Sequence, residues 1–283
     1  PALLGALVLV MATARLLGEG VQRLGQPAVL GELLAGVLLG ASGLGVLDPA
    51  DPVLHALSEF GVLILLFEIG LHTDLRTLAR VGGAATTVGA VGMALPFALG
   101  FGVARALGLD VLPATVAAAA LTATSIGISA RVLSDVGELD SPEGQVVLGA
   151  AVLDDVGGLV ILSVVSGLAA GGALTLGGVA ATTAIALGFV VGALVLGRLV
   201  VPPLFRGLAR MRAAGTLAVF GLAFAFALAW VAQAAGSAMI IGAFAAGLVL
   251  HGTPQRAEIE RATTTVGHVV VPIFFAVVGA SVD

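Results

Sequence analysis

Apolar runs of about 20 residues recur along almost the whole chain, and each is long enough to cross a bilayer core of about 30 Å as a helix. Of the 283 residues, 59% are hydrophobic and only 10% are charged. A soluble α/β protein would alternate strands with helices that carry polar faces, and these runs do neither. The pattern therefore predicts an all-α, polytopic membrane protein.

The distribution of basic residues predicts how the spans are oriented. All 12 basic residues are arginines, and nearly all lie in or beside odd-numbered connections, with Arg105 as the exception. The protein is expected to lie in the cell (inner) membrane. Cytoplasmic loops are rich in positive residues, so the odd-numbered connections are expected in the cytoplasm and the N-terminus on the outer side. Pro202 and Pro203 are expected to end the seventh helix. The ten expected spans are 2–21, 27–42, 54–72, 82–106, 111–134, 144–168, 174–200, 214–232, 236–252 and 264–282.

An internal repeat relates the second and third spans to the ninth and tenth. Gly31–Leu39 and Gly242–Leu250 share the pattern G-xxx-AG-xx-L, 211 positions apart. The following spans agree more loosely, with Phe-xx-Gly-xxx-Asp at 67–74 against Phe-xxx-Gly-xxx-Asp at 275–283. The second span runs outward and the ninth inward. The repeat is therefore expected to be inverted in the membrane, as in many secondary transporters.

The repeat also predicts a truncated chain. The counterpart of the sixth span would lie 211 positions further on, beyond Asp283. Three spans of the second repeat are then expected to be missing, with the seventh span linking the two repeats.

Two adjacent acids, Asp154 and Asp155, lie in the middle of the sixth span, within GAAVLDDVGG. A carboxylate at the bilayer centre costs roughly 2.5–3.5 kcal/mol on insertion scales, so the pair is expected to bind something. Successive helical residues point about 100° apart, so one acid can line an ion cavity while the other meets a second partner. Carboxylate oxygens suit hard cations, and competition of a cation with protons for one site is sufficient for exchange. Pairing with an arginine is the structural alternative, but the arginines nearest in sequence are expected in loops.

The fifth span carries four hydroxyls and a glycine within nine positions, from Leu121 to Ser129. Such a stretch can unwind, so that carbonyls and hydroxyls become free to coordinate an ion. In the alternative, each hydroxyl only bonds the carbonyl four residues back. The acid pair in the next span favours an ion site, with Thr124 and Ser125 as ligands and Thr122 and Gly127 as accessory residues.

Other acids are interpreted more conservatively. Glu68 lies near the cytoplasmic end of the third span, where a structural role is favoured over assistance in ion entry. Glu32 is likewise expected to serve packing or orientation. The acidic residues between the fifth and sixth spans, with Arg131, form either a solvated face or a funnel that attracts cations.

Six segments together resemble the second cation–proton antiporter family, which contains bacterial sodium/proton antiporters and relatives of the glutathione-gated potassium efflux systems. The adjacent acids Asp154 and Asp155 resemble the sodium-type branch, whereas the potassium efflux branch usually has Gln before its Asp. The segments are 26–40, 65–75, 122–133, 149–160, 242–250 and 272–283.

The resemblance implies an inverted-repeat fold of thirteen helices with broken crossing helices, of which about ten are present here. A core would move against a dimerising scaffold. Scaffold helices would occupy 1–78 and 206–283, the first half of the core 79–170 and a linker helix 171–205, with the second half of the core absent.

The resemblance also implies residue roles. Asp155 would be the principal carrier of cation and proton, and Asp154 would pair with a lysine of the eleventh helix, although this sequence contains no lysine. Thr124 and Ser125 would lie at the break in the fifth helix. A homodimer surrounded by membrane lipids is implied, with no cofactor and no nucleic-acid partner.

The sequence thus predicts a secondary transporter, not an enzyme, that exchanges sodium or lithium for protons by alternating access. A potassium/proton exchanger of the same fold and a non-transporting truncated remnant remain as alternatives. An intramembrane aspartyl protease needs two carboxylates that converge on one water, whereas adjacent helical residues diverge. The chain also lacks the tyrosine that such a protease motif requires.

Overall fold

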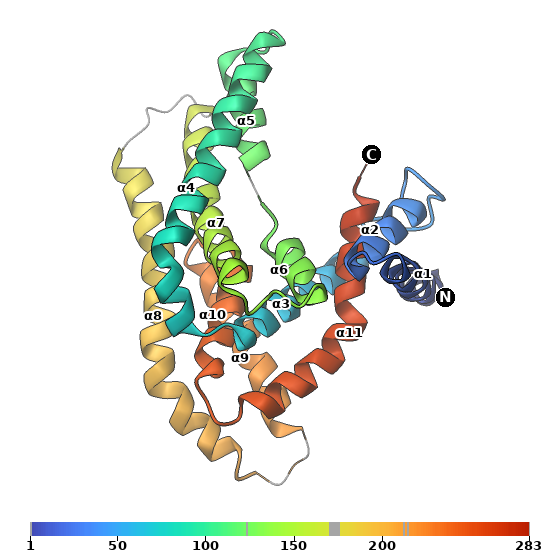
Figure 1. Cartoon of the computed structure of the whole chain (residues 1–283), viewed down its shortest axis with the longest axis vertical. Helices are drawn as coiled ribbons and strands as arrows, with labels where there is room; N and C mark the ends of the chain where they lie inside the picture. The colour runs from blue at the N-terminus through green and yellow to red at the C-terminus, as the bar shows by residue number, and fades with distance from the viewer. Residues whose placement is uncertain (1, 123, 170–175, 212, 214, 283) are drawn as a thin grey trace.

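The computed structural model describes residues 2–122, 124–169, 176–211, 213 and 215–282, and the regular structure within them is entirely α-helical (Figure 1). The start of the predicted seventh span, Arg212 and Asp283 lie outside these residues. The helices are α1 Ala2–Arg23, α2 Ala28–Leu39, α3 Pro52–His72, α4 Leu75–Ala106, α5 Val111–Thr122, α6 Ile126–Asp135, α7 Pro142–Ala169, α8 Leu176–Leu208, α9 Thr216–Ala234, α10 Met239–His251 and α11 Arg256–Ala280.

The predicted all-α membrane architecture is confirmed, with one helix for each expected span except the fifth. That span is divided into α5 and α6. Seven stretches of the described residues are long and apolar enough to cross a membrane, and α2 and α10 are shorter apolar helices. The expected end of a helix at Pro202 is wrong, because α8 continues to Leu208. Both prolines lie near the arginine-rich end of α8, where water can reach carbonyls that have lost their helical partners.

Capping residues explain where the central helices begin. Asp51 accepts hydrogen bonds from the amides of Val53 (2.9 Å) and Leu54 (3.1 Å), which starts α3. Asp74 accepts one from the amide of Arg76 (2.9 Å) and starts α4 directly after α3 ends. A carboxylate at this position satisfies amides that have no acceptor within the helix. Because of this cap, α4 starts at Leu75, seven residues before the start at residue 82 that the apolar run predicts.

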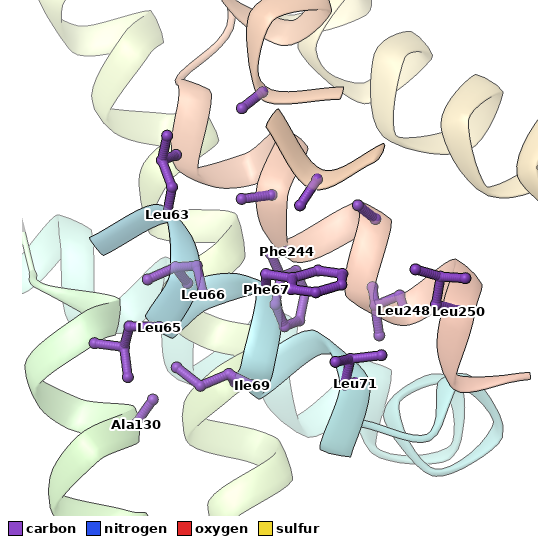
Figure 2. Close-up of a cluster of buried hydrophobic side chains, with 14 of the residues drawn as sticks. Leu63, Leu65, Leu66, Phe67, Ile69, Leu71, Ala130, Phe244, Leu248 and Leu250 are labelled. Atoms are coloured by element: carbon purple, nitrogen blue, oxygen red, sulfur yellow. The ribbon is translucent and has the colours of Figure 1, made fainter. Parts of the chain in front are cut away.

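Helix α3 forms the centre of the largest buried cluster. Its residues from Leu63 to Leu71 pack against α10, and Figure 2 shows Phe67 beside Phe244 with Leu248 and Leu250 further along the same helix. Phe67 and Leu71 have no exposed surface. Helices α1, α2, α3, α9, α10 and α11 pack mainly with one another, whereas α4 packs mainly with α5 and α7.

Close glycine contacts confirm the repeat and extend it to α1 and α9. Gly31 of α2 lies against the backbone of Leu17 and Gly18, so closely that a Cβ there would overlap it. Gly242 of α10 lies in the same way against Leu228 and its neighbour Ala229. All of these counterparts are 211 positions apart. The packing of α1 on α2 is therefore repeated by α9 on α10.

The third helices of the two repeats pack reciprocally. Gly70 of α3 lies against Gly247 of α10, and Gly279 of α11 lies against Gly36 of α2. This relation corrects one detail of the sequence match. Gly36 and Gly247 are counterparts in the repeat. Gly36 faces the carbonyl of Ala276, and Gly247 faces the carbonyl of Phe67. The counterpart of Phe67 is therefore Ala276 and not Phe275.

The two repeats meet where α3 crosses α11. A Cβ at Gly61 would lie 2.6 Å from the carbonyl oxygen of Val270. These two residues are counterparts in the repeat, because they are 209 positions apart, as Gly70 and Gly279 are. A pseudo-two-fold axis therefore passes through this crossing. Counting α5 and α6 as one span, α2 and α10 are seven crossings apart, so the repeat is inverted as predicted.

Replacing Gly70 by leucine is expected to destabilise the protein, because the new side chain would meet the backbone of α10, which cannot move aside as a side chain can. The expected loss is roughly 1–3 kcal/mol or more in the free energy of unfolding. Thermal unfolding in detergent measures it. Gly102→Leu is the control, since a Cβ at Gly102 meets nothing within 4 Å. Equal melting temperatures for the two variants would contradict the close contact.

Candidate functional site

The break between α5 and α6 is the predicted unwound stretch. Helix α5 ends at Thr122, whose hydroxyl donates to the carbonyl of Ala119 (2.7 Å). Helix α6 begins at Ile126 after Ser125, whose backbone is extended and whose hydroxyl accepts a hydrogen bond from the amide of Ile128 (3.3 Å). The serine thus serves as the N-cap of the second half-helix. The stretch is therefore broken by its own capping groups and presents backbone polar atoms in mid-span.

Asp154 of α7 connects to this break. Its Oδ2 accepts a hydrogen bond from the amide of Thr124 at 2.9 Å, and the residue is only 9% exposed. At a break in a helix the amide has lost its usual carbonyl acceptor, and an ionised carboxylate forms a stronger bond than a neutral group does. The bond therefore holds the centre of α7 against the gap between α5 and α6.

The two acids point to different surroundings, as their adjacency predicts. Asp154 lines a cavity of about 170 Å³ together with Thr124 and Ser129, and Gly89 and Gly92 of α4 form part of its opposite wall. Asp155 is half-buried and is not among the residues that line this cavity. Among the described residues, neither acid forms an ion pair. The structure thus brings Asp154 and Thr124 together but not Asp155.

The remaining predicted residues lie in other places. A Cβ at Gly127 would meet the side chains of Leu65, Leu66 and Phe274 at ordinary van der Waals distance. Glu68 accepts a hydrogen bond from the hydroxyl of Thr264 and lines a separate cavity of about 370 Å³ between α3, α6 and α11. Glu68 is therefore not a ligand in the cavity of Asp154.

Sequence reasoning missed three polar contacts beside the site. Thr264 lies 196 positions from Glu68, and no pattern in the chain connects them. Arg131 is grouped by the sequence with the acidic residues after the fifth span, yet in α6 it contacts both Glu32 and Asp135. The spacing of Arg131 and Asp135 along one helix was a signal that could have been used, because residues four apart share a helix face.

An inverted repeat of apolar helices, with a broken helix facing a buried carboxylate, defines a secondary transporter. Comparisons with known proteins agree. Residues 7–283 match the family described as "Sodium/hydrogen exchanger, transmembrane". The chain therefore belongs to the sodium/hydrogen exchanger family, whose members are transporters and not enzymes.

Individual relatives cover nearly all of this chain. It is 39% identical to the high-affinity Na⁺/H⁺ antiporter NhaS3 of Synechocystis, over 98% of this chain and 68% of that protein. It is 32% identical to the probable Na⁺/H⁺ antiporter GerT of Bacillus cereus, over 98% and 73%. The glutathione-regulated potassium-efflux protein KefC of Enterobacter is 30% identical, over 99% of this chain and 45% of that protein.

A solved structure confirms the fold. The sodium proton antiporter MjNhaP1 of Methanocaldococcus jannaschii superposes with a TM-score of 0.72, over 100% of this chain and 72% of that one, at 17% sequence identity. At an identity this low, the likeness shows that the two proteins share a fold. The expected resemblance and fold class are thus confirmed.

Replacing Asp154 by alanine is expected to expose the amide of Thr124 to hydrogen exchange, since its acceptor is lost. The part-buried amide without a partner should also cost stability, by at most about 1–3 kcal/mol. Hydrogen–deuterium exchange followed by mass spectrometry measures the effect on the segment around residue 124. Asp154→Asn keeps an acceptor oxygen and should preserve most of the protection. Asp155→Ala is the matched control, and equal exchange in both alanine variants would contradict the role of Asp154.

Proposed function

We propose that this chain exchanges sodium or lithium for protons across the cell membrane by alternating access. The observation that carries the proposal is the hydrogen bond between Asp154 and the broken helix, because it places an ionisable oxygen group at the break in mid-membrane. A monovalent cation and a proton compete for such oxygens. The cation enters as protons leave, and the reverse occurs on the other side.

The ligands that we propose are Asp155, Asp154, Thr124 and Ser125. One oxygen of Asp154 is taken by the amide of Thr124, and the other is available to a cation. Asp155 diverges from it on the helix and is proposed as the principal carrier, as the family resemblance implies. Accessory roles remain for Thr122 and Gly127, which border the break, and for Glu68 in the neighbouring cavity.

The two groups of packed helices support a division into a scaffold and a moving core. Helices α1–α3 and α9–α11 pack on one another across the pseudo-two-fold axis, which is the arrangement proposed for the scaffold at 1–78 and 206–283. Helices α4, α5 and α7 form the other group and are proposed as the core at 79–170. Helix α8 contacts both α7 and α10 and suits the linker.

The proposed orientation places the N-terminus outside the cell. The ends of α1, α6 and α8 and the starts of α4 and α11 carry most of the arginines, and the positive-inside rule assigns that side to the cytoplasm. In Figure 1 the end of α8 and the α10–α11 connection lie toward the bottom, whereas the α4–α5 connection and the end of α11 lie toward the top. A homodimer within membrane lipids is proposed on the family resemblance alone.

Asp155→Asn is expected to abolish sodium-driven proton movement, because the amide can neither ionise nor bind a proton in exchange for a cation. The measurement is fluorescence quenching of a pH dye in inverted membrane vesicles after addition of sodium. Asp110→Asn, an exposed acid in the α4–α5 connection, is the matched control and should retain full exchange. Retained exchange in Asp155→Asn at normal protein abundance would contradict the proposed role of Asp155 as the principal carrier.

A cation series in the same vesicles separates the remaining alternatives. Sodium and lithium are expected to drive proton movement at lower concentrations than potassium. The match to KefC, a potassium-efflux protein, motivates the comparison. Preference for potassium would favour the potassium/proton exchanger. Folded protein that responds to none of the three cations would favour a chain that does not transport.

A further inference from the structure

A buried charge cluster connects α6 to α2. Arg131, near the C-terminal end of α6, has Nη2 3.6 Å from Oε1 of Glu32 in α2 and Nε 3.0 Å from Oδ1 of Asp135. The other oxygen of Asp135 accepts a hydrogen bond from the amide of Val29 (3.4 Å), in the first turn of α2. An amide at a helix start has no acceptor within its own helix, so Asp135 supplies one from outside. We call Arg131, Glu32 and Asp135 the latch.

The latch is shielded from solvent, unlike most arginine–acid pairs at a surface. The side chain of Glu32 is 1% exposed, that of Arg131 18% and that of Asp135 11%. Exposed pairs contribute little, whereas loss of one partner from a buried pair leaves an uncompensated charge. Oε2 of Glu32 has no hydrogen-bond partner among the described residues. Glu32 therefore depends on Arg131 for its one close polar contact in this arrangement.

Helix α6 joins the latch to the site of Asp154. Its ten residues span about 15 Å at the usual helical rise. The break at Thr124, which holds Asp154, lies at one end, and the latch lies at the other. A short helix moves as a rigid rod, so a shift of its C-terminal end against α2 also displaces the break. The latch therefore positions the ion site from a distance.

The latch borders an interface that alternating access must change. Arg131, Ser134 and Asp135 line the cavity of about 370 Å³ between α6 and the helices α3 and α11. Ser134 and His268 in its wall are exposed, so the cavity opens on the arginine-rich side. Apart from this cluster, α6 contacts its neighbours through apolar side chains, of which Ile126 and Ala130 are buried and Ile128, Val132 and Leu133 partly buried. A polar latch that can open and re-form suits a helix that must slide.

We propose that Arg131 is a positioning residue which, with Glu32 and Asp135, holds α6 on α2 while the site faces the arginine-rich side and releases it when the site faces the other side. The proposal rests on the alternating-access function proposed above. A permanent ion pair that moves as one unit with α2 and α6 is the competing account. The two accounts predict different results. Removing a latch that forms in only one state changes the relative populations of the two access states, whereas removing a permanent ion pair does not.

The first test compares Michaelis constants on the two sides of the membrane. Glu32→Gln/Arg131→Gln removes one charge of each sign, so this double variant keeps the net charge of the latch, whereas Arg131→Gln alone would leave Glu32 buried without its basic partner. A smaller population of the state that faces the arginine-rich side raises the apparent KM there. The ratio of the sodium KM values in inverted and right-side-out vesicles is expected to change about tenfold.

Arg131→Lys is the conservative control for this measurement. A lysine keeps the charge but lacks the planar fork with which an arginine engages two carboxylates, so the ratio should move only part of the way. A structural role alone would lower kcat or abundance equally on both sides. An unchanged ratio in a folded double variant would overturn the proposal.

The second test does not depend on transport. The chain contains no cysteine, so a single Ser134→Cys gives a unique thiol in the cavity wall. Its rate of modification by a membrane-impermeant maleimide from the arginine-rich side is expected to fall severalfold when the latch is removed by the double variant. Asp140→Cys, in the exposed α6–α7 connection, should react at the same rate with and without the latch.

The two tests separate failure of the latch from failure of the transport function. If labelling at position 134 slows while no cation drives proton movement, the latch stands and the exchange function is wrong. If exchange is normal and neither the labelling rate nor the KM ratio responds to the double variant, the latch is wrong and the function stands.

Discussion

The hydrogen bond from the amide of Thr124 to Asp154 makes the break in the fifth span tolerable. In hydrocarbon, an unsatisfied backbone group costs several kcal/mol, so a helix can open in mid-membrane only where the protein supplies the missing partner. A carboxylate in mid-membrane is costly in the same way unless it is bound. The two unfavourable features satisfy each other. This mutual dependence explains why the hydroxyl-rich stretch and the acid pair occur in successive spans.

The glycine crossings supply the rigid surroundings in which this bond can have a defined geometry. Gly70 against Gly247 and Gly36 against Gly279 bring helix backbones close enough that no side chain fits between them. Without a hydrophobic driving force between helices in lipid, such close packing is a main source of association. Since the same crossings recur across the pseudo-two-fold axis, the helices around α3 and α11 form one continuous packed unit.

Helix α6 belongs fully to neither group. Its start caps the break through Ser125, and its last turn reaches α2 through Arg131 and Asp135. The contacts at its two ends are polar, and polar contacts can exchange partners or water more readily than interdigitated apolar side chains can. The position of α6 explains how a change at the carboxylates could be felt at the surface of α2, some turns of helix away.

Much of the fold and part of the site followed from the sequence, because both leave local or periodic marks. Length and hydropathy defined the spans, the pattern around Gly31 and Gly242 revealed the repeat, and the hydroxyls beside Gly127 marked the break. Boundaries failed where caps and charges extend a helix beyond its apolar run, as Asp74 does for α4. The predicted alignment of the third helix in the second repeat was wrong by one residue at Phe275, since chance matches of apolar residues are common.

The sequence by itself determined that this is a bundle of membrane-crossing helices with two acids in mid-span, since the bilayer permits few alternatives for such a composition. Only the tertiary structure decided which acid meets the break, where Glu68 and Thr264 pair, and that Arg131 reaches Glu32. These contacts join residues from different helices, and an amphipathic pattern carries no information on which helix will lie opposite. Partner choice is made by the packing of whole helices, and that choice exists only after folding.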